Sequence, residues 1–334
     1  MTPPRRGAAA WILALIVMMP ASGAGPAGES WIKPKARDSV LVGMADAGGR
    51  WIAVGERGHV LVSDDGRAWE QVPAPTRVLL TAVALDGHGL GLAVGHDATI
   101  IRTRDNGDTW DRVYHDPEAQ APLLDVIIAG DDRAIAVGAY GLYLESNDGG
   151  RTWTERILEP EALASASSTE DEEDEEIYYD YHLNDIAIAG DGRWYIAAEA
   201  GNVYRSDDRG GSWLRLSSPY EGSFFGVLPL DGEEVLLFGL QGRLFHSPDA
   251  GVGWTRIDTG ADATLAAGLR LPNGRALVAG YAGIVLNNVD AGRDPTRTTL
   301  ANRPAISDAR LLDNGDLLTV GDEGIRIWPA ADLP

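Results

Sequence analysis

Aspartate and tryptophan recur together in this chain at a regular spacing. Five segments follow the pattern Ser/Thr-x-Asp-x-Gly-x-Thr-Trp in full or near-full form, and a sixth keeps only Asp290 and Gly292. Carboxylates gathered in one place can act as general acids and bases or hold a hard cation. The residues concerned are Asp65, Asp105, Asp148, Asp208 and Asp249, with Trp69, Trp110, Trp153, Trp213 and Trp254.

The spacing favours a structural role for these carboxylates. Each motif lies one repeat away from the next, so the aspartates are expected around a rim and not in one cluster. A short carboxylate beside a glycine turn accepts backbone N–H groups, and the tryptophan ring packs across the base of the hairpin. We therefore expect structural Asp-boxes, with no catalytic, metal-binding or cofactor-binding residue among them.

A second motif identifies the elements that position the Asp-boxes. An apolar run ending in a small residue is followed by Gly or Ala, two variable residues and usually Gly. The first positions of this motif are 40, 43, 60, 41, 41 and 41 residues apart, which is the period of a four-stranded propeller blade. The seven copies are Val54–Gly58, Val94–Ala98, Val137–Gly141, Ala197–Gly201, Phe238–Gly242, Ala279–Gly283 and Val320–Gly324.

The repeat predicts an all-β fold, a seven-bladed β-propeller of four-stranded antiparallel blades spanning residues 25–329. Gly-, Asp- and Asn-rich turns join the first two strands of each repeat, and the second strand is an apolar run typical of burial on both faces. The segment Trp31–Pro34 resembles a fourth strand, whereas the last repeat, beginning at Ile306, has only three. We therefore expect the N-terminal strand to complete the last blade.

The first 24 residues have the pattern of a secretory signal. Arg5 and Arg6 precede an apolar run from Ala8 to Met19, and small residues follow. A run of this length is short for a membrane span, so we expect cleavage near Gly23 or Ala24 and a periplasmic location. An uncleaved membrane anchor is the alternative. The chain contains no cysteine, so its stability must come from the core and from ring closure.

The net charge of −22 argues against nucleic acid and against direct lipid binding, because both present anionic surfaces. It suits a protein partner with a basic patch, or it serves solubility. Much of the charge lies in an insertion, residues 161–181, between the third and fourth blades. This insertion is either a docking arm that carries Tyr178, Tyr179 and Tyr181 or a tolerated surface loop.

The variable pairs of the glycine motif should ring one face of the propeller, opposite the Asp-boxes, where a binding site on a rigid scaffold is expected. The alternative for each residue is a solvated turn. The histidines show no paired spacing, no Ca²⁺-loop pattern occurs, and no phosphate-binding glycine loop leads into a helix, so we predict no metal and no cofactor. With the three tyrosines of the insertion, the candidate partner-binding residues are Arg57, His96, Tyr140, Glu199, Gln241, Tyr281 and Asp322.

The two motifs together resemble the photosystem II stability/assembly factor family of seven-bladed propellers, over residues 30–328. That resemblance implies a protein-binding assembly factor and not an enzyme. The chain differs from photosynthetic members in its acidic insertion and in having no evident arginine-rich face. We therefore expect a non-enzymatic scaffold or accessory factor for an inner-membrane protein or transporter complex. The alternative is a glycan-binding or glycoside-hydrolysing Asp-box protein, which as a sialidase would need an arginine triad and a tyrosine nucleophile.

Overall fold

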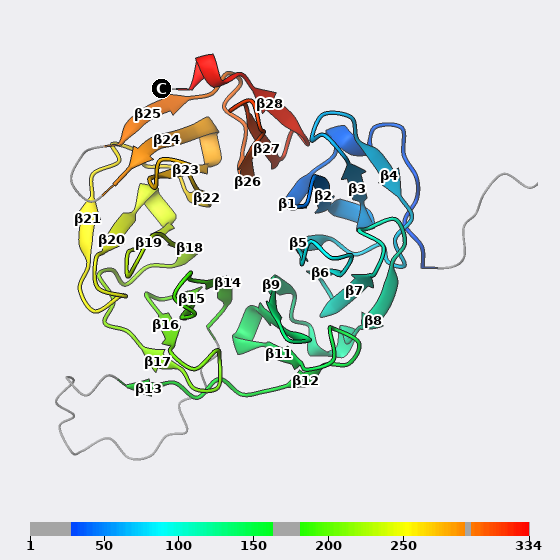
Figure 1. The fold of residues 1–334 in the computed structure, drawn as a ribbon, viewed down its shortest axis with the longest axis horizontal. Coiled ribbons are helices and arrows are strands. Elements are labelled where there is room, and N and C mark those ends of the chain that lie inside the picture. Colours follow the sequence, from blue (N-terminus) through cyan, green and yellow to red (C-terminus); the bar gives the residue numbers. More distant parts are fainter. Residues whose placement is uncertain (1–27, 163–180, 291–294, 334) are drawn as a thin grey trace, which may run out of the picture.

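The computed structural model describes residues 28–162, 181–290 and 295–333. Seven sheets stand around a central axis, and their strands are antiparallel except for one added parallel strand at the outer edge of the fourth (Figure 1). The predicted all-β, seven-bladed propeller is thereby confirmed. The helical segments of the described residues are short 3-10 turns, and none is long and apolar enough to cross a membrane.

The blades are numbered in chain order, and each runs from an inner strand at the axis to an outer strand at the rim (Figure 1). Their strands are β1 (Leu41–Ala47), β2 (Arg50–Gly55), β3 (Val60–Ser63) and β4 (Glu70–Val72) in blade 1; β5 (Leu80–Leu85), β6 (Gly91–Gly95), β7 (Thr99–Thr103) and β8 (Asp111–Tyr114) in blade 2; β9 (Leu123–Gly130), β10 (Arg133–Gly138), β11 (Tyr143–Ser146) and β12 (Thr154–Glu155) in blade 3; β13 (Glu161–Ala162), β14 (Leu183–Ile188), β15 (Trp194–Ala198), β16 (Val203–Ser206) and β17 (Leu214–Arg215) in blade 4; β18 (Phe224–Pro229), β19 (Val235–Gly239), β20 (Leu244–Ser247) and β21 (Thr255–Ile257) in blade 5; β22 (Leu265–Arg270), β23 (Ala276–Gly280), β24 (Ile284–Val289) and β25 (Thr296–Thr299) in blade 6; and β26 (Ile306–Leu311), β27 (Leu317–Gly321) and β28 (Arg326–Trp328) in blade 7. The 3-10 turns are η1 (Ala36–Asp38), η2 (Glu56–Gly58), η3 (Pro117–Ala119), η4 (Ala139–Gly141), η5 (Leu240–Gly242), η6 (Tyr281–Gly283) and η7 (Ala330–Asp332).

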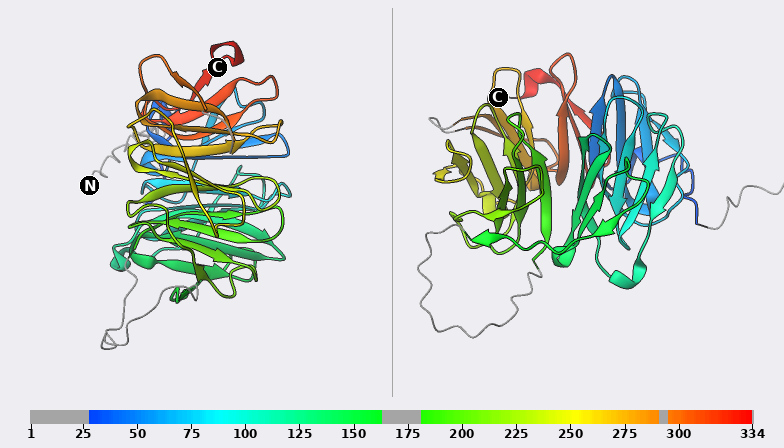
Figure 2. Two further views of the ribbon diagram at one scale, coloured as in Figure 1. Left: turned by 90° about the vertical axis from the view of Figure 1, so that its left-hand side faces the viewer. Right: turned by 60° about the horizontal axis from the view of Figure 1, so that its bottom comes forward.

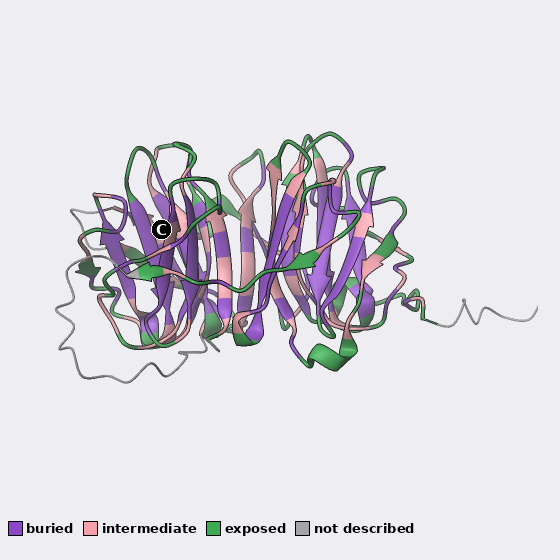
Figure 3. Ribbon diagram, turned by 90° about the horizontal axis from the view of Figure 1, so that it is seen from below, coloured by how far each residue is buried: buried purple, intermediate pink, exposed green. Residues whose placement is uncertain are grey.

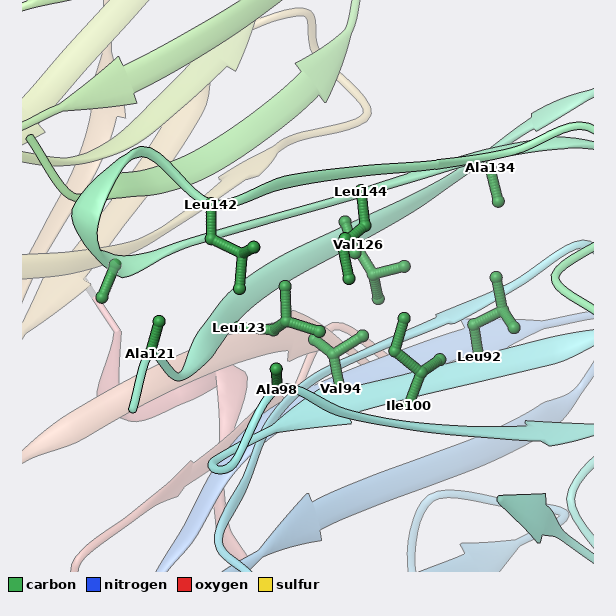
Figure 4. Packing of buried hydrophobic residues seen from close by; sticks show 12 residues of the cluster. Leu92, Val94, Ala98, Ile100, Ala121, Leu123, Val126, Ala134, Leu142 and Leu144 are labelled. Carbon is green, nitrogen blue, oxygen red and sulfur yellow. The ribbon is translucent and has the colours of Figure 1, made fainter. Parts of the chain in front are cut away.

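The core lies between the blades. Seven clusters of buried apolar side chains fill the seven junctions, one each. At the junction of blades 2 and 3, Leu92 and Ile100 face Leu123 (Figure 4). Burying such a side chain stabilises the fold by about 1.5–3 kcal/mol. Because both faces of each middle strand are covered, residues along these strands are buried. The turns on the two faces of the ring stay exposed (Figure 3).

The glycine motif needs its two glycines for different reasons, as blade 1 shows. Gly55 has an extended backbone with φ of −177°, but a Cβ there would lie 2.2 Å from the carbonyl oxygen of Val40, just before the neighbouring inner strand. Gly58 has a φ of +69°, and its Cβ would lie 2.2 Å from the carbonyl oxygen of Thr76. The first glycine therefore permits close packing, and the second also permits a left-handed turn.

The predicted closure of the ring is wrong in one respect. Among the described residues, blade 7 has three strands, and the segment Trp31–Pro34 forms no strand with β28. Its polar groups bond to blade 1 instead: the side-chain amide of Gln71 accepts the N–H of Lys33 at 2.7 Å and donates to the carbonyl of Trp31 at 3.0 Å. The backbone groups that a strand would use for pairing are engaged by one side chain of β4.

Packing and side-chain bonds close the ring between blades 7 and 1. Leu318 and Val320 of β27 pack against Leu41 and Met44 of β1 in the cluster of this junction. The carboxylate of Asp308 in β26 accepts the backbone N–H of Met44 at 2.9 Å. The two ends of the ring are therefore joined at the axis by a carboxylate and at mid-radius by the core. Figure 2 shows blade 7 beside blade 1 from the side.

Candidate functional site

The Asp-box face consists of turns that satisfy their own polar groups. In blade 3, the Oδ1 atom of Asp148 accepts the N–H groups of Arg151 and Thr152, both at 2.9 Å, and its Oδ2 atom accepts the Thr152 hydroxyl. These bonds, led by the one from the Thr152 N–H, lower the pKa of Asp148 to about 2. Asp208 in blade 4 makes the same contacts with Ser212, and its pKa is also about 2.

The same arrangement, with small variations, holds the other Asp-box carboxylates. Hydrogen bonds lower the pKa of Asp65, Asp105 and Asp249 as well. The ring nitrogen of Trp110 donates to the carbonyl of Gly107 at 3.0 Å, and its ring belongs to the core between blades 1 and 2. Each carboxylate thus serves its own hairpin. The described residues contain no group of three His, Asp or Glu side chains arranged to hold a metal ion.

The β2–β3 turn of blade 1 and its equivalents in the other six blades lie on the opposite face, which we call the loop face. In η2, η4, η5 and η6 the second variable residue has a left-handed backbone, with φ between 55° and 58°. This conformation costs a non-glycine residue about 1 kcal/mol or more and directs its side chain outward. Arg57, Tyr140 and Gln241 occupy this position and are exposed.

Exposed aromatic side chains gather on the loop face over blades 3 to 6. Tyr140 is 60% exposed, Tyr281 48% and Phe225 36%, which is unusual for large side chains. The ring of Tyr140 meets the edge of His182, with 4.8 Å between ring centroids. We call this set the aromatic arc; it comprises Tyr140, His182, Phe225, Leu240 and Tyr281.

Three of the candidate residues from the sequence meet at the junction of blades 3 and 4. Glu199 lies 3.3 Å from the Nδ1 atom of His182, and the carbonyl of Tyr181 accepts the N–H of Gly141 beside Tyr140. Phe225, Leu240 and His182 were not among the predicted residues. Phe225 lies in an inner strand, where sequence periodicity predicts burial, so its exposure at the mouth of the channel depends on the three-dimensional fold.

Of the other candidates, Gln241 in blade 5 is exposed, and Tyr281 in blade 6 belongs to the aromatic arc. Those of blades 1, 2 and 7 are dispersed over the charged half of the loop face. Arg57 lies 3.9 Å from Glu56, His96 is exposed, and the Asp322 carboxylate accepts the N–H of Ala305 at 2.9 Å. Tyr178 and Tyr179 lie outside the described residues, as do positions 163–180 of the acidic insertion and the signal segment. The loop face therefore has an apolar half and a charged half.

A channel of about 600 Å³ runs along the axis, and the aromatic arc reaches its mouth. Phe225, Leu240 and Tyr281 line it on one side. Deeper, three carboxylates of the inner strands line its wall: Asp125 in β9, Asp185 in β14 and Asp308 in β26.

Each channel carboxylate bonds to the next blade. Asp125 accepts the N–H of Ile186 at 3.0 Å, and Asp185 accepts the N–H of Val227 at 2.7 Å. Sequence reasoning missed these residues, although a signal exists: each aspartate stands thirteen residues before the Gly or Ala at the second position of its glycine motif. The other blades have Gly or Ala at the matching point of the strand register.

Burial shifts the pKa of the channel aspartates upward, opposite to the shift at the Asp-boxes. Desolvation, followed by the charge of Asp185, raises the pKa of Asp125 well above its usual value. Desolvation also raises the pKa of Asp185 and of Asp308, although Arg310 partly offsets the effect at Asp308. The charge of Asp185 thus disfavours the charged form of Asp125, so the two carboxyls titrate as a pair.

Sequence comparison identifies the family of this propeller. The chain matches the family described as photosynthesis system II assembly factor YCF48 over residues 61–161 and 114–275, which together exceed half of its length. The chain belongs to the YCF48 family. Among curated protein sequences, none matches it.

Solved structures support the fold of this YCF48-family chain. A structure titled "YCF48 bound to D1 peptide" is 15% identical, covers 90% of this chain and 96% of its own, and superposes with a TM-score of 0.67. YCF48 from Cyanidioschyzon merolae is 14% identical, with 90% and 98% covered and a TM-score of 0.65. A streptogramin B lyase is 10% identical, with 87% and 94% covered and a TM-score of 0.67. At these identities the likeness concerns the fold alone.

The channel of this YCF48-family chain differs from what a sialidase-like site would need. One arginine, Arg310, stands among the described residues that line it. The guanidinium of Arg310 already donates to the carboxylate of Asp308 at 2.5 Å and to the carbonyl of Met44 at 3.0 Å. The described lining therefore offers no arginine triad for a substrate carboxylate, and the glycan alternative gains no support from it.

Proposed function

We propose that this protein is an exported, non-enzymatic assembly or accessory factor that binds a segment of a protein partner across the aromatic arc at the mouth of the channel. Membership of the YCF48 family supports an assembly role. The structure titled "YCF48 bound to D1 peptide" supports a polypeptide ligand, because it records such a ligand on a propeller of this family.

The exposed rings of Tyr140, Phe225 and Tyr281 carry the proposal. Large aromatic side chains on the surface of a rigid scaffold bury much area on binding and lose little side-chain entropy. Phe225 and Tyr281 line the mouth of the channel, so an apolar side chain of the partner can enter there while its backbone crosses the loop face toward Tyr140. The charged half of that face, with Arg57 and Asp322, is suited to positioning the partner and contributes less affinity.

The signal-like segment supports export to the periplasm, where an inner-membrane protein or transporter complex presents segments of the required kind. The net charge of −22 favours a partner with basic residues near the bound segment. Since the carboxylates of the Asp-boxes are occupied by backbone N–H groups and Arg310 is held by Asp308, the proposed role involves no catalytic step.

Photo-crosslinking in native cells tests the proposal. A crosslinker at Tyr140 or Tyr281 should capture an inner-membrane protein, recovered with the membrane fraction, whereas one at Arg57 or Asp322 should capture far less. Peptides tiling the exposed segments of the captured protein then serve as ligands. We expect the double change Tyr140→Ser and Tyr281→Ser to weaken binding at least tenfold, and Arg57→Ser to weaken it less than threefold. Equal crosslinking from both halves, or equal loss in both variants, would contradict the site.

A further inference from the structure

Blade 7 leaves a third strand without an outer neighbour. In the other six blades the third strand is covered by a fourth, and β3 and β20 are buried throughout. The residues of β28, in contrast, are all partly exposed, and among the described strands β28 pairs only with β27 (Figure 1). An unpaired strand edge offers backbone N–H and C=O groups to an incoming strand.

The core at the closing junction also lacks a side chain that every other junction has. At the other six, an apolar residue in or just after the fourth strand enters the cluster shared with the next blade. At the junction of blades 7 and 1 the chain supplies the small Ala36 of η1 instead. The six residues are Val72, Val113, Leu158, Leu216, Ile257 and Leu300.

A groove of about 580 Å³ marks the unfilled volume. Leu61 and Trp69, which belong to the cluster of the closing junction, line it on blade 1, and Ala36 lines it on the N-terminal segment. Lys33 and Arg37 also line the groove, and no ion pair holds either of them within the described residues. The groove lining also includes Asp64, which is paired with Arg50, and Glu70, so its unpaired positive charge is confined to the N-terminal segment.

The outer edge of blade 4 shows that this propeller accepts an added strand. β13 joins β17 in parallel, and its Glu161 N–H donates to the carbonyl of Trp213 at 2.8 Å. The edge of blade 7 is close to the groove, because the carbonyl of Arg37, which lines the groove, accepts the N–H of Ile325 just before β28.

We propose that β28 is a second binding site, at which an extended segment of a partner protein adds as the fourth strand of blade 7. The six fourth-strand regions of this chain define what fits: a Val, Leu or Ile that packs beside Ala36, next to an acidic residue that pairs with Lys33 and Arg37. This site is distinct from the aromatic arc and does not depend on it.

A short synthetic peptide tests the edge directly. The probe is the capped heptapeptide Ala-Trp-Glu-Gln-Val-Pro-Ala, the sequence of residues 68–74, which carries both features. With the full chain we expect saturable binding and at least tenfold slower amide hydrogen exchange in β28. We expect the variant Lys33→Glu with Arg37→Glu to bind the probe about tenfold more weakly, and a probe with Lys in place of Glu to prefer that variant.

Two controls separate binding at β28 from binding at the aromatic arc. Serine in place of the probe's Val should abolish binding, whereas Tyr140→Ser with Tyr281→Ser should leave it unchanged, so failure of the aromatic arc and failure of the edge are distinguishable. Slowed exchange at the edges of other blades, unaltered binding by the charge variant, or dimers of the free protein that protect β28 would each overturn the proposal.

Discussion

Blade 3 carries two aspartates with opposite electrostatic behaviour. Asp148, at the Asp-box, accepts two backbone N–H groups and two hydroxyls, and its pKa falls to about 2. Asp125, in the channel, accepts the N–H of Ile186 and faces Asp185, and its pKa rises. Blade 4 repeats the contrast with Asp208 and Asp185.

The contrast teaches that the number of donors and access to water decide what a carboxylate does in this fold. At the rim, each Asp-box carboxylate accepts several N–H and O–H groups, and these hydrogen bonds favour its charged form. In the channel, the same side chain joins neighbouring blades but is desolvated and lies near another carboxylate. The Asp-box gains stability from charge, whereas the channel pair loses stability when both members are charged.

The largest effect is expected where a channel carboxylate closes the ring. Asp308→Ala removes the acceptor of the Met44 and Ala309 N–H groups and one of the partners of Arg310. We expect the free energy of unfolding to fall by about 2–4 kcal/mol. Urea denaturation measures it, with the exposed turn residue Asp313→Ala as the control. A loss equal to that of the control would show that core packing alone closes the ring.

A smaller effect is expected at the rim, where water can replace the lost bonds. Asp148→Ala leaves the N–H groups of Arg151 and Thr152 without their carboxylate, and we expect a loss of about 1–2 kcal/mol at pH 7. Asn147→Ala, beside it and exposed, is the control.

The pH dependence of the rim variant follows from the lowered pKa. A carboxyl with a lowered pKa in the folded state stabilises the fold above its unfolded pKa, near 4, and loses that contribution as the pH falls toward about 2. The stability difference between wild type and Asp148→Ala should therefore shrink across this window. A difference that stays constant with pH would mean that the carboxylate acts by shape and not by charge.

Much of this contrast could be predicted from the sequence, because the rim is built from local contacts. Asp148 and Thr152 lie four residues apart, so the motif alone indicates their bond. The glycine motif gives the blade count because in six of its seven copies a Cβ at the first glycine would clash with a neighbouring segment, as at Gly55, and the fourth copy keeps the small Ala198.

The channel and the closure depend on contacts between distant segments. Asp125 meets Ile186 of the next blade, 61 positions along the chain, and only an alignment of the repeats by their first glycine brings the two aspartates into the same layer. Similarly, the strand-like pattern of Trp31–Pro34 was misleading because Gln71, in another blade, binds its backbone groups. The contact of Tyr140 with His182 also crosses a blade boundary.

The smallest effect, and the sharpest test of the comparison, comes from neutralising one member of the channel pair. In Asp125→Asn the amide oxygen can still accept the N–H of Ile186, and the amide nitrogen can donate to Asp185. The substitution keeps the shape and removes a charge that desolvation disfavours. We expect stabilisation by about 1 kcal/mol at pH 7.

The sign of its pH dependence should be opposite to that of the rim variant. A carboxyl with a raised pKa in the folded state favours folding most when protonated, so its contribution is present near pH 4 and is lost as the pH rises through the raised pKa. The advantage of Asp125→Asn over wild type should therefore be absent near pH 4 and grow toward pH 7. Asp111→Asn, an exposed change of equal charge, controls for the general repulsion of an acidic chain. An equal gain in the control would assign the effect to net charge. Destabilisation by Asp125→Asn at pH 7 would mean that hydrogen-bond donors stabilise the charged form of Asp125, as they do at Asp148.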